Sequence, residues 1–460
     1  ASEDARSKAD VLQAVGRVAE SMRRALGDTI PSDELAAETF TAASLEAVKE
    51  YTIAQTLSAD RKNDEAITHY KAAIQADPNF GRAYAGWATA AYDSGRIAEA
   101  NEKYETAMSL IGQMTEREKY RTRGNYFVNV AHNNEKAMEQ YKALVTKYPS
   151  DFAGHNNLAV TYFAALNFAE ARVEGRRALD LYPRSLKFQG NYALYAMYAS
   201  DFTAGADVAR EIVRKEPSYV LAYLPLAMEA LAAGDIAGAK SVYKQVASTG
   251  GEGASLSAIG LADVAMVEGH PEEAVRVLPS AIQADQARKD AAGAAAKTIA
   301  LAEAQSLLKQ TAAAIKSVDD ALQISADIQI VVPAARILLA AGQEQRASDL
   351  IKKLDDSIQP LNRAYARMLD GERLTALGRA GDAMDSLTRA RSLADLWLVR
   401  FTTGVAYQRF NHHVEAVTEL ENCSSRIGEA TAIFLDDVPT FRYTVPMREL
   451  LRRAQQGGAK

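Results

Sequence analysis

Apolar residues recur at three- and four-residue steps along most of the chain, which predicts amphipathic helices joined by short polar turns. The stretch 63–80, NDEAITHYKAAIQADPNF, shows this pattern clearly. The apolar face of its helix contains Ala66, Tyr70, Ala73 and Ile74. Asp77 is expected to end the helix, because a residue that precedes a proline, here Pro78, is disfavoured in the α region.

The same pattern returns along the whole chain, and each copy opens its apolar face with a small residue. We call these eleven positions the anchor residues: Ala66, Ala100, Ala137, Ala171, Gly205, Ala239, Ala274, Ala314, Ala347, Ala383 and Ala416. Successive spacings between them are 34, 37, 34, 34, 34, 35, 40, 33, 36 and 33 residues. Two antiparallel helices cross closely only where one of them has a small side chain, so the anchors predict eleven helix pairs.

A helix–turn–helix unit that repeats about every 34 residues is the tetratricopeptide signature. The predicted fold is therefore all-α: a right-handed α-solenoid of about eleven tetratricopeptide helix pairs, with capping helices at both ends. Four segments are expected. They are an amphipathic capping or coupling helix with a connector (1–44), a regular array that forms a groove (45–250), an alanine-rich and more divergent array (251–427), and a C-terminal turn with a capping helix (428–460).

Composition narrows the functional classes. The net charge of −6 offers no global field that would favour nucleic acid. Apolar runs are too short to span a bilayer, and the single cysteine, Cys423, is expected to be a small buried residue. The chain opens ASEDARSK without methionine, so we expect a processed protein or a piece of a longer one. The compartment stays open between cytoplasmic and extracytoplasmic, with a tether to the inner membrane through a missing N-terminal part as one option.

Four stretches resemble one known group of proteins: TAASLEAVKEYTIAQTL (41–57), the repeat at 63–95, MTEREKYRTRGNYF (114–127) and LDDVPTFRYTVPMRELLRRAQ (435–455). They are similar to the C-terminal tetratricopeptide region of bacterial serine/threonine protein kinases and related signalling proteins that are abundant in acidobacteria. This resemblance implies a sensory or scaffolding segment, often separated from the kinase by a membrane span. It does not bring kinase chemistry into this chain.

Catalytic motifs are absent from the sequence. It has no glycine-rich phosphate loop followed by a strand, no H-R-D and no D-F-G. The adjacent histidines, His412 and His413, are expected in a solvated turn, and the pair Asp436 and Asp437 is expected to make turn hydrogen bonds. We therefore predict no enzymatic activity, no cofactor and no metal.

Polar residues recur at the repeat period on the first helices of the early pairs. Arg123, Asn157 and Asn191 are spaced 34 residues apart, and Lys119 and Lys187 lie one helical turn before the first and third of them. The other residues expected to border the same concave groove are Tyr51, Gln55, Arg82, Thr89, Tyr92, Tyr126, Asn129 and Asn156. Asparagine is a poor helix former, so its repetition suggests amides that bind an extended peptide, while the cations would attract a carboxylate.

Two other interpretations of these residues stay open. Asn157 and Lys187 resemble part of the carboxylate clamp of chaperone-binding tetratricopeptide domains, whereas Thr122, Tyr126 and Asn191 depart from it. The amides could instead form structural hydrogen bonds between neighbouring repeats.

The leading functional prediction is a non-catalytic module for protein–protein interaction or scaffolding in a signalling or multi-subunit assembly. Its partner would be a protein or an extended peptide in the concave groove, and no nucleic acid. One alternative is a small-molecule sensor attached to a kinase or another effector. The other is a structural accessory subunit embedded in a larger complex through its alanine-rich half.

Overall fold

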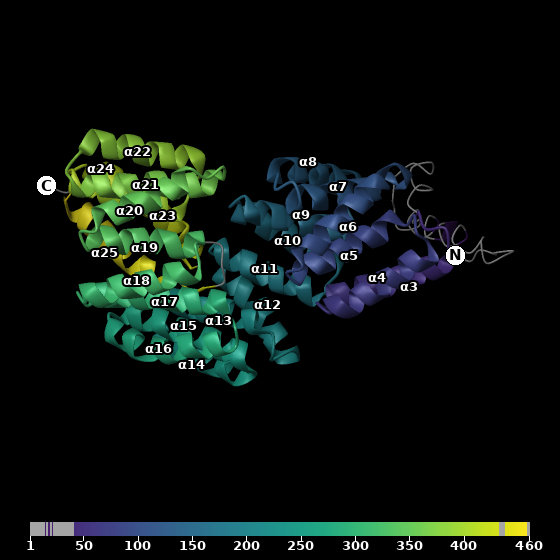
Figure 1. Ribbon diagram of the computed structural model, residues 1–460, viewed down its shortest axis with the longest axis horizontal. Coiled ribbons are helices and arrows are strands. Elements are labelled where there is room, and N and C mark those ends of the chain that lie inside the picture. The colour runs from purple at the N-terminus through teal and green to yellow at the C-terminus, as the bar shows by residue number, and fades with distance from the viewer. Residues whose placement is uncertain (1–13, 15–16, 19–20, 22–40, 432–437, 458–460) are drawn as a thin grey trace. The chain divides into compact units, whose positions relative to one another are not determined.

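A computed structural model describes residues 14, 17–18, 21, 41–431 and 438–457. These residues form 23 α-helices, labelled α3 to α25, and no β-strand (Figure 1). The helices follow one another as antiparallel pairs, which confirms the predicted all-α solenoid. The capping or coupling helix predicted within residues 1–44 lies outside the described residues, apart from the few positions given above.

The eleven pairs agree in number with the prediction. Their first helices are α3 (Leu45–Ala59), α5 (Gly81–Asp93), α7 (Glu116–Asn129), α9 (Phe152–Ala164), α11 (Leu186–Tyr198), α13 (Tyr223–Ala232), α15 (Gly251–Glu268), α17 (Ala291–Leu307), α19 (Ile328–Ala340), α21 (Pro360–Ala376) and α23 (Trp397–Arg409). Their second helices are α4 (Asn63–Ala76), α6 (Ile97–Ser109), α8 (Asn134–Lys147), α10 (Phe168–Leu181), α12 (Phe202–Lys215), α14 (Ile236–Val246), α16 (Pro271–Ala287), α18 (Thr311–Ile324), α20 (Glu344–Asp355), α22 (Ala380–Leu393) and α24 (His413–Ser425). A last helix, α25 (Thr444–Gly457), packs against α24, so the predicted C-terminal capping helix is present.

The backbone confirms the repeat register independently of the side chains. Five residues before each anchor, the chain adopts a left-handed conformation with φ between 48° and 82°. These residues are Arg61, Gly95, His132, Leu166, Ser200, Gly234, Gly269, Lys309, Gly342, Gly378 and Asn411. A left-handed residue ends one helix and turns the chain back toward the next, so this geometry recurs in the turn of every pair. All eleven anchor residues are buried, as the crossing of the paired helices requires.

Side-chain caps start several of the helices that carry the candidate site. Ser44 accepts a hydrogen bond from the backbone N–H of Ala47 at the start of α3. Thr115 and Glu118 form a reciprocal capping box on α7, and Asp151 accepts from the N–H of Gly154 on α9. Each cap satisfies a donor that a helix start leaves without an intrahelical partner.

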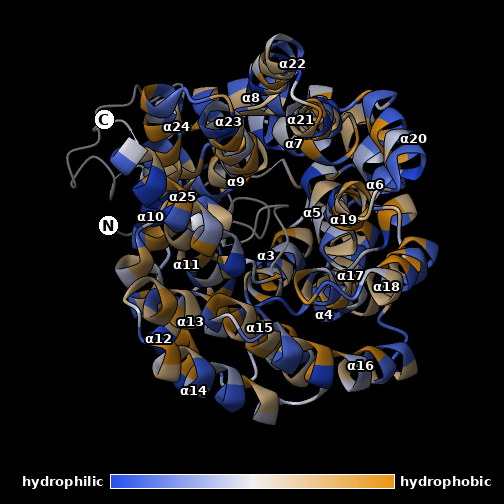
Figure 2. Ribbon diagram, turned by 90° about the vertical axis from the view of Figure 1, so that its left-hand side faces the viewer, coloured by the Kyte–Doolittle hydropathy of each residue, from blue (hydrophilic) through white to orange (hydrophobic). Residues whose placement is uncertain are grey.

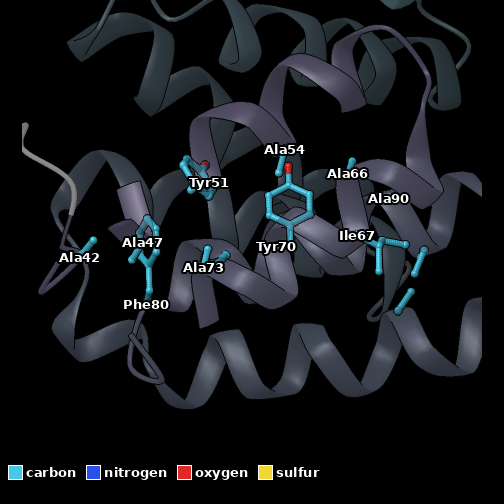
Figure 3. Close-up of a cluster of buried hydrophobic side chains, with 13 residues drawn as sticks. Ala42, Ala47, Tyr51, Ala54, Ala66, Ile67, Tyr70, Ala73, Phe80 and Ala90 are labelled. Carbon is cyan, nitrogen blue, oxygen red and sulfur yellow. The ribbon is translucent and has the colours of Figure 1, made fainter. Parts of the chain in front are cut away.

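Tyrosines fill the space that the small anchor residues leave. Figure 3 shows Tyr51, Tyr70 and Phe80 among alanines between the first two pairs. The ring centroids of Tyr51 lie 5.9 Å from those of Tyr70 and 5.0 Å from those of Phe80. Gly86 on α5 faces the Tyr70 ring so closely that a Cβ would overlap it, which explains why no larger residue stands there.

The chain divides into two compact units, residues 1–195 (unit 1) and 196–460 (unit 2). Helices such as α14, α16 and α22 carry both hydrophilic and hydrophobic residues, in keeping with the amphipathic pattern (Figure 2). The two predicted arrays, 45–250 and 251–427, differ in the residues of their repeats, and the division between them is not a break in packing. Their bounds stay a prediction.

Ala100 offers a test of the anchor positions. The Ala100→Leu variant is expected to lose about 1–3 kcal/mol of unfolding free energy, because Ala100 is fully buried between paired helices and the larger side chain would overpack the crossing. The exposed Ala98 lies on the same helix, so Ala98→Leu is the matched control and should change stability by less than about 0.5 kcal/mol. Urea unfolding of both variants measures the difference, and equal midpoints would contradict the proposed register.

Candidate functional site

Unit 1 contains a pocket of about 270 Å³. The first helices of five consecutive pairs, α3, α5, α7, α9 and α11, supply most of its lining. The repeats therefore bring together side chains that are far apart in the sequence. The pocket is polar at its centre and aromatic at one side.

Three cationic side chains line the pocket, Arg82, Arg121 and Lys187, and no aspartate or glutamate is among the lining residues. Arg82 is 6% exposed. Its guanidinium donates hydrogen bonds to Thr122 Oγ1 at 3.1 Å and to the Tyr51 hydroxyl at 3.4 Å. Within the described part of the chain, no carboxylate forms an ion pair with Arg82, and Glu118 acts on its charge only from beyond contact distance.

Arg121 is held in place by a buried carboxylate. Asp151 accepts from Arg121 Nε at 2.9 Å and from Arg117 Nε at 2.7 Å, and its side chain is fully buried. Burial alone would raise the pKa of Asp151, but the charges and hydrogen bonds of the two arginines lower it to about 2. Two guanidinium groups therefore donate to this one carboxylate.

Helix α11 and the residue before it close the pocket against the first two pairs. The Lys187 ammonium on α11 forms an ion pair with Asp93 at the end of α5. The hydroxyl of Ser185 donates to the carbonyl of Ala59 at the end of α3, at 3.3 Å. These contacts join residues 94 and 126 positions apart, so unit 1 curls around the pocket.

An aromatic wall borders the cationic side. The ring of Phe152 stacks on that of Tyr182 with 5.0 Å between centroids and 23° between planes. The ring centroid of Phe188 lies 6.0 Å from that of Phe152, so Phe188 completes the wall. All three rings line the pocket, and Phe152 is 37% exposed.

A chain of amide hydrogen bonds crosses the first helices from α5 to α11. Asn125 Nδ2 donates to Thr89 Oγ1 at 3.2 Å, and Asn157 Nδ2 donates to Asn125 Oδ1 at 2.9 Å. Asn156 Nδ2 donates to Asn157 Oδ1 at 3.1 Å, and Asn191 Nδ2 donates to Asn156 Oδ1 at 3.0 Å. We call these five side chains the amide ladder. It links four consecutive pairs and satisfies polar groups that are partly or fully buried.

Each of the first three pairs also bonds a polar residue of its first helix to a tyrosine hydroxyl of its second. These hydrogen bonds join Gln55 to Tyr70, Thr89 to Tyr104, and Asn125 to Tyr141. Burial raises the pKa of Tyr104 to about 12, so its hydroxyl stays protonated and available as a hydrogen-bond partner.

Comparison with known proteins agrees with the repeat geometry. A family model described as tetratricopeptide repeat matches residues 51–108 and 130–185. The chain contains tetratricopeptide repeats. No curated protein matches the sequence.

Solved structures that resemble the chain include other helical repeat proteins. A tetratricopeptide repeat protein from Parabacteroides merdae is 15% identical, covering 51% of this chain and 92% of its own, with a TM-score of 0.33. The APC/C hetero-tetramer Cut9–Hcn1 is 12% identical over 97% and 94% of the two chains, with a TM-score of 0.38. PilW, a type IV pilus biogenesis factor, is 15% identical over 45% and 94%, with a TM-score of 0.34. The assignment of the fold rests on the repeats of the chain itself.

The tetratricopeptide array brings only part of the predicted groove to the pocket. Six predicted residues line it: Gln55, Arg82, Thr89, Asn156, Asn157 and Lys187. Seven lie outside the lining: Tyr51, Tyr92, Lys119, Arg123, Tyr126, Asn129 and Asn191. Among these, Tyr51 is buried beside Arg82, and Asn129 donates to the Tyr104 hydroxyl at 2.6 Å.

The three predicted residues spaced 34 apart behave differently from one another. Asn157 and Asn191 belong to the amide ladder, so the hydrogen bonds between repeats that the sequence left as an alternative are present. Arg123 is not in the ladder, and its neighbour two positions on, Asn125, takes the place expected for it. Binding of a peptide by the predicted residues stays a prediction.

Sequence reasoning missed Arg121, Asn125, Phe152 and Phe188, which line the pocket. A usable signal existed for Asn125, because it precedes Tyr141 by 16 residues, as Gln55 precedes Tyr70 by 15. No comparable signal marks the other three, since they enter the pocket through contacts between distant repeats.

Other candidate chemistry is structural where the structure describes it. Burial raises the pKa of the Cys423 thiol to about 12, so this side chain is a neutral core residue, as predicted. In the described ranges, no three His, Cys, Asp or Glu side chains gather as metal ligands would. Among the helices that the structure describes, none combines the length and the apolar character needed to cross a bilayer. Asp436 and Asp437 lie outside the described residues.

Proposed function

We propose that the chain is a non-catalytic interaction module, and that its unit 1 pocket binds an acidic or carboxylate-terminated segment of a protein partner. The observation that carries this proposal is the composition of the pocket lining: three cations, four amides and no carboxylate. Tetratricopeptide arrays commonly act as surfaces for protein partners. The positive charge of this pocket favours an acidic segment as the part of the partner that binds.

The cations are arranged to bind an anion. Arg82 is held by Thr122 and Tyr51 and is shielded from water, so a carboxylate would meet a preorganised guanidinium. Lys187 lies on the facing side, and its pair with Asp93 is partly exposed, so the ammonium can turn to an arriving carboxylate. Asn156 and Asn157 would offer the remaining amide groups to the backbone of the segment.

The size of the pocket limits what enters it. A volume of about 270 Å³ holds a few side chains rather than a folded element. Phe152 and Phe188 at its edge would cover an apolar neighbour of the acidic group. We therefore favour the end of a segment, or one acidic residue with its neighbours.

Paired synthetic peptides test the proposal. Fluorescein-labelled decapeptides that end in Phe-Glu-Glu are prepared with a free C-terminal carboxylate and, separately, as the C-terminal amide. We expect the free acid to bind more tightly, and Lys187→Gln to weaken its binding at least about tenfold, the loss typical of one charge-assisted hydrogen bond. The exposed Lys62, at the turn between α3 and α4, provides the control Lys62→Gln, which should bind as the wild type does. Equal binding of acid and amide, or equal loss in both variants, would reject the proposal.

The amide ladder leads to a separate prediction. Replacing Asn157 and Asn191 together with alanine is expected to weaken peptide binding by about 1–3 kcal/mol. The structure adds a cost that the sequence did not reveal, because both amides donate to neighbouring helices and each lost bond removes about 1 kcal/mol of stability. Fluorescence anisotropy measures the first effect and urea unfolding the second. Binding that falls only in proportion to the unfolded fraction would leave the ladder with a structural role alone.

A small anionic molecule is the rival ligand, because the pocket is small and enclosed by the contacts of the fifth pair with the first. A dicarboxylate that saturates the site and is unaffected by peptide would favour this sensor function. The resemblance to arrays attached to bacterial kinases stays a prediction, and it concerns what precedes the array rather than what the pocket binds.

A further inference from the structure

Unit 2 carries four charged residues at one repeat position. Asp263, Glu303, Arg336 and Glu372 lie on α15, α17, α19 and α21, and each stands eleven residues before an anchor. Gln55 and Thr89 hold the same position in unit 1, where they line the pocket. These four side chains therefore mark the equivalent face of unit 2, formed by the first helices of its pairs.

The chain's own segment 438–444 lies on this face. The buried carboxylate of Asp263 accepts from the backbone N–H of Phe441 at 2.9 Å and from that of Arg442 at 3.2 Å. The same carboxylate accepts from Arg442 Nη1 at 2.9 Å. One carboxylate thus recognises both the backbone and the side chain of the segment, as a peptide-binding groove does.

A second carboxylate completes the recognition of the arginine. Glu303 accepts from Arg442 Nε at 2.9 Å, and its other oxygen accepts from the Tyr443 hydroxyl. The Arg336 guanidinium lies 5.9 Å from the centre of the Tyr443 ring and is held by Glu372 at 3.0 Å. Three consecutive repeats therefore contact three consecutive residues of the segment, and Glu372 of the fourth repeat holds Arg336 in place.

The segment is well buried where it contacts this face. Phe441 is 1% exposed, and the Arg442 side chain is 11% exposed. Burial raises the pKa of Asp263 despite the opposing effect of Arg442, so a carboxylate in this position depends on a cationic partner. Two hydrogen bonds from Thr440, to the carbonyls of Thr431 and Ala430, hold the start of the segment.

We propose that this face of unit 2 is a binding site for a short segment that carries an arginine between two aromatic residues in one turn of 3₁₀ helix, and that residues 438–444 are its ligand within the same chain. The site is acidic, whereas the unit 1 pocket is cationic. The two units therefore differ in the chemistry of the segment that each accepts. A partner that carries the same arginine–aromatic pattern competes with the chain's own segment.

Covalent attachment favours the internal ligand. A tethered segment has an effective concentration in the millimolar range, so a free peptide with equal contacts cannot displace it at micromolar concentration. A substitution that removes only the arginine would release the segment and leave the acidic residues of the site unchanged.

The probe is a labelled synthetic peptide with the sequence of residues 438–445, VPTFRYTV. Its binding to the full chain is measured by fluorescence anisotropy. We expect the Arg442→Gln chain to bind the probe at least about tenfold more tightly than the wild type, because the internal competitor has lost its guanidinium. Arg452 lies exposed on α25, so Arg452→Gln is the matched control and should behave as the wild type does. A probe with glutamine in place of its arginine should not bind, and adding Glu303→Gln to Arg442→Gln should abolish binding.

Two results would overturn the proposal. The first is a folded Arg442→Gln chain, shown by unchanged helical circular dichroism, that fails to bind the probe. The second comes from hydrogen exchange on the wild-type chain, which needs no variant to fold. We expect the amides of Phe441 and Arg442 to exchange faster than the central amides of α15, because the segment can leave while the helices remain. Equal protection would show that the segment is an inseparable part of the core.

Discussion

Replacing Lys297 with methionine is expected to lower the free energy of unfolding by about 3 kcal/mol. Lys297 is 2% exposed, and its ammonium donates to Asp285 at 2.5 Å and to Ser255 at 2.7 Å. Methionine matches the length of the side chain but removes the charge, so Asp285 would stay buried without its main partner. Loss of one member of a buried pair typically costs about 3–5 kcal/mol, and Arg288, which remains 2.7 Å from Asp285, places the cost at the lower end.

Urea unfolding with matched controls measures this cost. Lys316 forms an exposed pair with Asp320, so Lys316→Met should change stability by less than about 0.5 kcal/mol. Replacing Asp285 with leucine in the Lys297→Met chain should recover part of the loss, because no buried charge then remains. If Lys297→Met and Lys316→Met have the same midpoint, the buried pair does not stabilise unit 2 as described.

The Asp151→Asn variant is expected to lose about 2 kcal/mol of unfolding free energy at pH 7, and the loss should vanish in acid. The pKa of Asp151 falls from a usual value of 3.8 to about 2 in the folded chain, and each unit of pKa corresponds to about 1.36 kcal/mol. A carboxyl with a lowered pKa stabilises the fold fully above its unfolded pKa, and this contribution disappears as the pH falls through the folded pKa. The stabilisation that the Asp151 charge provides is therefore lost between about pH 4 and pH 2. Asparagine is an equally good N-cap, so the substitution separates the charge from the cap of α9.

Unfolding free energies of the wild type and the variant at pH 7 and pH 2 test this prediction. The difference between the two chains should shrink toward zero at the lower pH. Asp180 forms an exposed pair with Arg176 on α10, so Asp180→Asn serves as the control and should have little effect at either pH. If Asp151→Asn loses the same unfolding free energy at both pH values, the carboxyl stabilises the fold through its packing and not through its charge.

The sequence was sufficient for the repeat architecture. The anchors at Ala66 and the ten related positions and the closing helix after residue 443 all follow from contacts within one pair or between adjacent pairs. Such contacts produce a periodic pattern of apolar residues in the sequence, because every pair must bury the same face against the next. The turns were predictable for the same reason, although Leu166 and Lys309 show that the left-handed position does not require glycine.

The candidate site was only partly predictable. Arg82, Asn157 and Lys187 were recognised as unusual polar residues on helices, and the structure places them in one pocket. The sequence did not reveal that Asn157 donates to Asn125, because the choice of partner depends on how neighbouring helices cross. It also placed Arg123 where Asn125 stands, although Arg123 lies at the same distance from its anchor as Asn157 does.

The sequence by itself determined the helix pairs, their register and their number, because these depend on periodic patterns within a few tens of residues. Only the tertiary structure decided which distant surfaces meet. Lys187 reaches Asp93 across 94 residues, and the backbone of Phe441 reaches Asp263 across 178. The curvature that brings such residues together accumulates from small rotations at every pair, so no local pattern of residues specifies it.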